Sequence, residues 1–136
     1  MFGDFNVRVG DLGPLPSELL PDLNLKLTRH SLDDVMNKKG QEFMEIMSGY
    51  PLILLNGRSD GDSFGEFTFI DLRGDELCCR VLDLAFVNFE VAELVQNFTV
   101  GEQFASDHRF FVISFTFNHS QDSPHQFSPT KITNLR

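Results

Sequence analysis

The stretch LCCRVLDLAFVN (residues 77–88) decides the fold, because its nearly continuous apolar side chains predict one long, buried β-strand. A single acidic residue, Asp83, interrupts the apolar run. A carboxylate in a buried strand costs several kcal/mol unless it is paired or binds a metal ion. Asp83 therefore marks the interior of a sheet and is also a candidate functional residue.

Two shorter strands are expected before this stretch. Leu52–Asn56 (LILLN) is a short apolar run, and Glu66–Ile70 (EFTFI) alternates between polar and apolar residues. The segment DLRGDE (residues 71–76) is expected to turn the chain between the second of these strands and residues 77–88. The sequence therefore predicts successive strands joined by short connections.

The residues after this stretch predict a further strand pair. Residues 89–100 indicate a short helical turn leading into a strand near Phe98–Val100. Residues 109–118 (RFFVISFTFN) predict the last strand, with one apolar face. The residues expected on that face are Phe111, Ile113, Phe115 and Phe117. Phenylalanine is in excess, at 15 of 136 residues, and this excess falls in short alternating runs, which favours sheet interiors.

One helix is expected upstream of the strands, within NKKGQEFMEIMSGYP (residues 37–51). Phe43, Met44 and Met47 share one helical face, and Gly49 and Pro51 end the segment. A helix followed by antiparallel-looking strands predicts an α+β (α/β-layered) domain over residues 1–117. Residues 118–136 are polar and aperiodic and are predicted to form a disordered tail.

Composition narrows the functional class. The net charge of −9 and the lack of a basic run argue against a protein that merely coats nucleic acid. They leave room for a nuclease, because a metal site is itself rich in carboxylates. The sequence has no run of about 20 apolar residues and no signal-peptide pattern, so we expect no membrane partner. The adjacent Cys78 and Cys79 are expected to be reduced, which predicts an intracellular protein, cytoplasmic or nuclear.

Three short groups of polar residues lie at the ends of strand-like segments. They are Asp4 with Asn6, Asp83, and Asp107 with His108. Two of the groups have a simpler explanation: Asp4 and Asn6 could form an Asx turn, and Asp107-His108 could be an ordinary loop dipeptide. For Asp83, a histidine is the natural partner, and His108 is available.

Together the three groups fit one kind of chemistry. A carboxylate paired with an imidazole fixes the tautomer of the ring and keeps it cationic beside a phosphate. A second carboxylate can bind a hydrated divalent metal ion through hard oxygen ligands. An Asp-X-Asn pair can position and deprotonate a water molecule while the amide donates to the phosphate. The combination predicts metal-assisted hydrolysis of a phosphodiester.

The order of these motifs resembles the endonuclease/exonuclease/phosphatase superfamily, which includes pancreatic deoxyribonuclease and the abasic-site endonucleases. The motifs are GDFN, LNGR, GDSFGEFTF, VLDLAFVN and SDH, across roughly residues 2–117. The closest similarity is to the endonuclease domain of non-long-terminal-repeat retrotransposon polyproteins. The resemblance implies the C-terminal half of a four-layer α/β sandwich of the deoxyribonuclease type, with mostly antiparallel sheets.

The resemblance also implies a role for each site residue. Asp4 would orient or deprotonate the attacking water, and Asn6 would hold the scissile phosphate. Asp83 would hydrogen-bond His108, which would bind and stabilise the phosphate or serve the leaving oxygen. Asp107 would lie on the metal side of the site, with Mg²⁺ or Mn²⁺ as cofactor and DNA as substrate. Two further positions, Asn56 and Thr68, would have supporting roles only.

The family's N-terminal half supplies the main metal-binding glutamate, and nothing before Gly3 matches it. Two functions are therefore expected. One is a fragment of a divalent-metal-dependent endonuclease, weak or inactive alone. The alternative is a non-catalytic interaction module, which would bury its exposed sheet face against a second copy or a partner chain that supplies the missing half.

Overall fold

The structure is a computed structural model that describes residues 1–11, 15 and 23–117; the predicted tail, residues 118–136, lies outside the described residues. The described residues form an α+β structure, as expected. In chain order the elements are β1 (Phe2–Asp4), α1 (Lys38–Met47), β2 (Leu52–Leu54), the 3₁₀ turn η2 (Asp60–Asp62), β3 (Phe69–Arg73), β4 (Glu76–Arg80), β5 (Asp83–Asn88), α2 (Phe89–Ala92), β6 (Val95–Gln103) and β7 (Arg109–Phe115).

All strand pairs are antiparallel, which confirms the expected kind of sheet. β5 lies in the centre of a three-stranded sheet of order β1-β5-β2. β3 pairs with β4, and β6 pairs with β7. An isolated bridge between Phe69 and His108 joins the start of β3 to the residue before β7.

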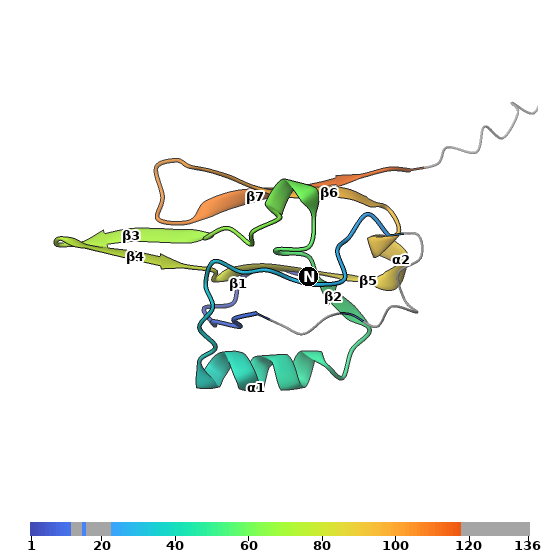
Figure 1. The fold of residues 1–136 in the computed structure, drawn as a ribbon, viewed down its shortest axis with the longest axis horizontal. Coiled ribbons are helices and arrows are strands. Elements are labelled where there is room, and N and C mark those ends of the chain that lie inside the picture. The colour runs from blue at the N-terminus through green and yellow to red at the C-terminus, as the bar shows by residue number, and fades with distance from the viewer. Residues whose placement is uncertain (12–14, 16–22, 118–136) are drawn as a thin grey trace, which may run out of the picture.

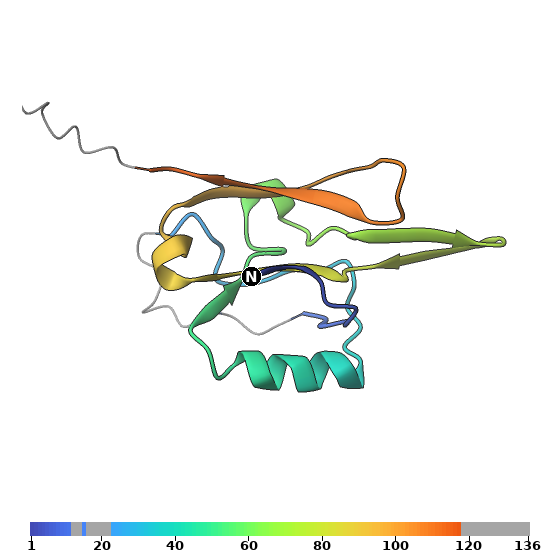
Figure 2. The same cartoon turned by 180° about the vertical axis from the view of Figure 1, so that it is seen from behind.

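The elements are stacked in layers, with the central sheet between α1 and the β6–β7 pair (Figures 1 and 2). β5 is buried on both faces because its side chains alternate between two apolar clusters. Leu84 and Phe86 belong to the cluster against which Phe43 and Met44 of α1 pack. The next residues along β5, Ala85 and Val87, belong to the cluster that contains Val95 and Phe98 of β6. This double burial explains the continuous apolar run seen in the sequence.

The single long strand expected over residues 77–88 is wrong. The structure contains two strands there, β4 and β5, which belong to different sheets. Two side chains replace strand partners at the intervening residues. The Val81 amide donates to Asp33 Oδ2 at 3.1 Å, and the Leu82 amide donates to Thr68 Oγ1 at 2.9 Å. The chain therefore leaves one sheet and enters the next without a gap in its apolar pattern.

The β3–β4 hairpin also differs from the expectation. β3 begins at Phe69 rather than Glu66, and it continues to Arg73. The turn is thereby reduced to Gly74 and Asp75, with Gly74 in the left-handed region at φ +64°. Figure 1 shows the hairpin extending well beyond the layered body, and its paired Leu72 and Leu77 are exposed.

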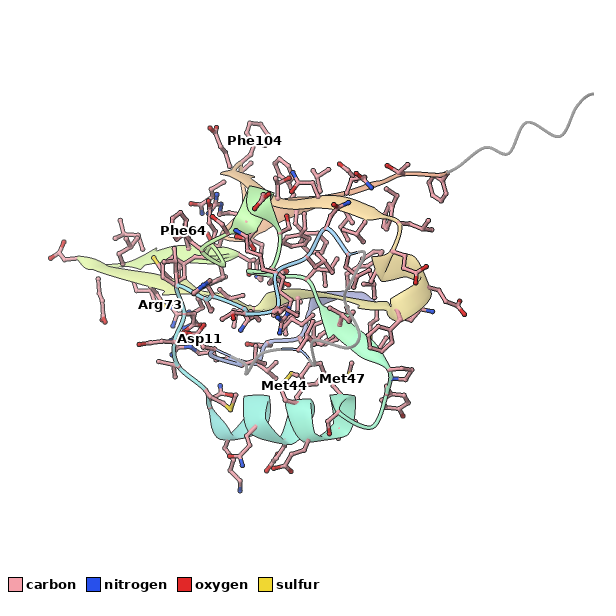
Figure 3. The ribbon with its side chains drawn as sticks, turned by 45° about the vertical axis from the view of Figure 1, so that its right-hand side comes forward. Asp11, Met44, Met47, Phe64, Arg73 and Phe104 are labelled. Carbon is pink, nitrogen blue, oxygen red and sulfur yellow. The ribbon has the colours of Figure 1, made fainter. Side chains whose placement is uncertain are left out.

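Helix α1 confirms the predicted amphipathic segment. Asn37 caps its first turn by accepting the Gly40 amide at 2.7 Å, and the helix ends before Ser48. Figure 3 shows Met44 and Met47 on the side of the helix that faces the sheet. None of the helices in the described ranges combines the length and apolar character that crossing a bilayer requires.

The apolar face expected for the last strand is only partly confirmed. Phe111 and Ile113 pack against the cluster between the sheets, but Phe115 and Phe117 remain 38% and 72% exposed. The opposite face of β7 is also apolar, since Phe110 is 58% exposed. β7 therefore has a core-facing side and an uncovered apolar side.

Candidate functional site

Three strand ends bring the candidate residues together. Asp4 is the last residue of β1 and Asp83 the first residue of β5, and the two are directly opposite in the antiparallel register. Directly opposed residues of such a pair present their side chains on the same face. His108 immediately precedes β7 and is held against β3 by its bridge to Phe69.

A histidine between two carboxylates forms the centre of the site. His108 Nδ1 lies 2.8 Å from Asp83 Oδ2, and His108 Nε2 lies 3.9 Å from Asp4 Oδ2. The Asp83 side chain is only 13% exposed, whereas those of His108 and Asp4 are 36% and 45% exposed. The predicted partnership of Asp83 with His108 is thus present, and the imidazole is accessible to a substrate.

The carboxylates raise the pKa of His108 and so favour the charged form of the imidazole. The hydrogen bond from His108 to Asp83 is the main cause of a raised His108 pKa, and the negative charges of Asp83, Asp4 and Asp107 add to it. Partial burial acts in the opposite direction but does not cancel these effects. A protonated His108 has two N–H donors and a positive charge, which suits binding of a phosphate.

The raised pKa of His108 predicts a pH-dependent stability. A group that binds its proton more tightly in the folded state stabilises that state below its unfolded pKa, about 6.5 for histidine. This contribution is lost as the pH rises through the higher folded pKa of His108. In urea unfolding across this range, the difference in stability between wild type and His108→Ala should shrink as the pH rises. The exposed Thr28, which does not titrate, provides the control, because Thr28→Ala should keep the wild-type dependence; a difference that is constant with pH would contradict the prediction.

The sequence left two interpretations of Asp4 open, an Asx turn and a site residue, and the Asp4 side chain makes the contacts of both. Its Oδ1 accepts the Asn6 amide at 2.8 Å, which is the hydrogen bond of an Asx turn, and Asn6 has a positive φ of 51°. Its Oδ2 is the oxygen that faces His108. The turn therefore orients the carboxylate instead of competing with the site.

The structure does not bring every predicted residue into the centre. Within the described part of the chain, the side chains of Asn6 and Asp107 make no hydrogen bond or ion pair with Asp4, Asp83 or His108. Asn6 is exposed beside Asp4, and Asp107 acts on His108 only through its charge. Both lie at the rim, where a substrate or a cation could reach them.

Two ion pairs next to the site were not predicted. Arg109, which follows His108, pairs with Glu66 at 2.8 Å and also donates to the Gly101 and Phe67 carbonyls, which fixes the start of β7. The buried Asp33 pairs with Arg8 and accepts the Val81 amide. Each pair joins residues at least 25 positions apart in the sequence, so no local pattern could have indicated either contact.

The donor chemistry of the rim fits a hard cation. Among the described residues, no group of three or more His, Cys, Asp or Glu side chains is arranged to hold a metal ion. Magnesium, however, is commonly bound through one or two carboxylates, with water and substrate phosphate completing its coordination. The exposed Asp107 carboxylate is a donor of this type, and like Asp4 it acts on His108 through its negative charge.

Comparisons with protein-family models, with curated proteins and with solved structures found no match to this chain. The functional assignment therefore depends on the geometry of the site.

Proposed function

We propose that residues 1–117 carry out divalent-metal-dependent hydrolysis of nucleic-acid phosphodiester bonds, as part of an endonuclease/exonuclease/phosphatase-type domain derived from a retrotransposon. The observation that carries this proposal is the Asp83–His108–Asp4 arrangement, in which one imidazole lies between a partly buried and an exposed carboxylate. The antiparallel layers around β5 are compatible with half of the deoxyribonuclease-type sandwich.

Each side chain has a role in this mechanism. Asp83 keeps the His108 ring protonated and oriented, so that the ring binds a non-bridging phosphate oxygen or donates its Nε2 proton to the leaving oxygen. Asp4 takes a proton from the attacking water through Oδ2, since Oδ1 accepts a hydrogen bond from the backbone amide of Asn6. The exposed side-chain amide of Asn6 binds the phosphate. Asp107 would hold Mg²⁺ or Mn²⁺, which neutralises phosphate charge when bound.

We expect slow turnover by this chain alone. The described residues offer no three-ligand metal group, so a cation would be held weakly. The net charge of −9 also repels a polyanion, and binding of DNA should need the cation to reduce this repulsion.

Supercoiled plasmid DNA is the direct test. With Mg²⁺ or Mn²⁺ the purified chain should convert the plasmid slowly to the open-circular form, and a chelator should stop the conversion. Nicking that is equal with and without the metal would contradict the proposed chemistry.

A second candidate function is a non-catalytic module that self-associates through the outer face of β7. Phe110 and Val112 of this face are 58% and 50% exposed. Phe64 and Phe104, at the periphery in Figure 3, are 69% and 84% exposed. Phe110 and Val112 lie two residues apart on the same face of β7, and contiguous exposed apolar surface commonly marks an interface.

Light scattering during size-exclusion chromatography tests this candidate. The wild type should be a dimer at micromolar concentration, and Val112→Lys should shift it to a monomer. The control is Thr28→Lys, an exposed position outside β7, which should not change the mass. A wild type that is monodisperse and monomeric would contradict self-association.

A further inference from the structure

Thr68 makes an unusual set of hydrogen bonds at the point where β5 begins. Its side chain is fully buried, and its Oγ1 accepts two successive backbone amides, those of Leu82 and Asp83, each at 2.9 Å. These amides lie where the chain passes from the β3–β4 hairpin to the central sheet. One hydroxyl therefore fixes the main chain that carries the Asp83 carboxylate.

The main chain of the same residue holds the other half of the site. The Thr68 carbonyl accepts the Arg109 amide at 2.7 Å, directly after His108. The neighbouring Ile70 amide donates to the Asp107 carbonyl at 2.8 Å, directly before it. The backbone of His108 is thus held on both sides by the segment that contains Thr68.

We infer that Thr68 is a positioning residue that sets the contact between Asp83 and His108. Its hydroxyl fixes the main chain at Asp83, and its carbonyl fixes the start of β7 next to His108. One residue therefore positions both partners of the 2.8 Å hydrogen bond between His108 Nδ1 and Asp83 Oδ2. The importance of this residue for catalysis rests on the proposed function, but its effect on the contact can be measured without any substrate.

Asn56 also supports the main chain of Asp83, and it makes no contact with His108. This buried amide donates to the Asp83 carbonyl at 3.1 Å and accepts the Ala85 amide at 2.9 Å. It continues the ladder between β2 and β5 beyond Leu55. Asn56 therefore fixes β5 relative to β2, whereas Thr68 fixes β5 relative to β7.

Ser59 offers a matched comparison for a purely structural hydroxyl. It is also fully buried, and its Oγ accepts the Phe98 amide at 2.9 Å and donates to the Phe98 carbonyl at 2.8 Å. Those bonds hold β6 and do not involve Asp83 or His108. Ser59→Ala should destabilise the protein without altering the contact between these two residues.

The tautomer of His108 reports on the contact. The Asp83 carboxylate accepts from Nδ1, so the neutral ring should carry its proton there in the wild type. Nitrogen-15 NMR of the full chain, with chelator present and at one alkaline pH, measures this directly. Thr68→Val, which keeps the shape but removes the hydroxyl, should give a mixture with the Nε2–H form. Thr68→Ser and Ser59→Ala should retain the wild-type tautomer.

If Thr68→Val does not fold, Thr68→Ala replaces it and is judged in the same way, because the smaller side chain leaves room for water at the two amides. A folded Thr68→Val or Thr68→Ala protein with an unchanged tautomer would overturn the inference. In plasmid nicking, Thr68→Val should lose at least about tenfold in rate while Thr68→Ser stays near the wild type. Absence of nicking by the wild type would overturn the proposed function and leave the tautomer to decide the role of Thr68.

Discussion

Replacing His108 with alanine should reduce metal-dependent plasmid nicking by about 10²–10⁴-fold, the usual contribution of a general acid–base group. The variant removes the only side chain that lies between the Asp83 and Asp4 carboxylates in the described structure. It leaves two unpaired negative charges facing the phosphate, so binding of the polyanion also weakens. The rate of open-circle formation with Mg²⁺ measures the loss.

His30→Ala is the matched control for this variant, because His30 is exposed and lies outside the site. It should nick at the wild-type rate. Asp83→Asn keeps the shape of the side chain but removes its charge, and it should lose about 10-fold or more because the ring is no longer held charged and oriented. Equal nicking by His108→Ala and the wild type would show that the activity does not come from this site.

Replacing Asp33 with alanine should lower the free energy of unfolding by about 3–5 kcal/mol, the typical effect of removing one partner from a buried ion pair. The Asp33 side chain is 2% exposed, and it binds Arg8 through both carboxylate oxygens. It also accepts the Val81 amide at 3.1 Å. The variant leaves a partly buried guanidinium and a buried amide without their partner.

A loss of this size is a large part of the stability of an ordinary domain, about 5–15 kcal/mol. Urea unfolding of the variant beside Asp34→Ala gives a direct comparison, since Asp34 is the exposed neighbour and should change stability by at most about 0.5 kcal/mol. Similar unfolding midpoints for the two variants would contradict the structural role of Asp33. Because Arg8 follows β1 and Val81 precedes β5, the loss should also loosen the two strands that carry Asp4 and Asp83.

The parts of the fold with local causes could be predicted from the sequence. Helix α1 follows from its apolar spacing and from the residues that end it. Asp83 could be identified because a charge inside an apolar run demands a partner, and His108 provides it. Both arguments need only short segments and the cost of burying a charge.

The parts that depend on distant side chains could not be predicted. The division of residues 77–88 into two strands depends on Thr68 and Asp33, which approach from other segments of the chain and leave no periodic signal. The extension of β3 to Arg73 places the exposed Leu72 in a strand without a buried face, so alternation could not reveal it. Asn6 and Asp107 lie at the rim of the site because of the turns that carry them, and the sequence pattern did not reveal the geometry of those turns.

The projecting β3–β4 hairpin offers a place to attach a tag or a fluorescent label. Gly74 itself should stay glycine because its φ is +64°, but its neighbour Asp75 is exposed in the same turn, so a short peptide tag or a fluorophore attached at Asp75 would lie outside the layered body. The base of the hairpin, at Phe69, pairs with His108. A fluorophore at the tip would therefore be attached to the hairpin whose base borders the site. Binding at the site could then be followed by fluorescence, without a label next to the reactive side chains.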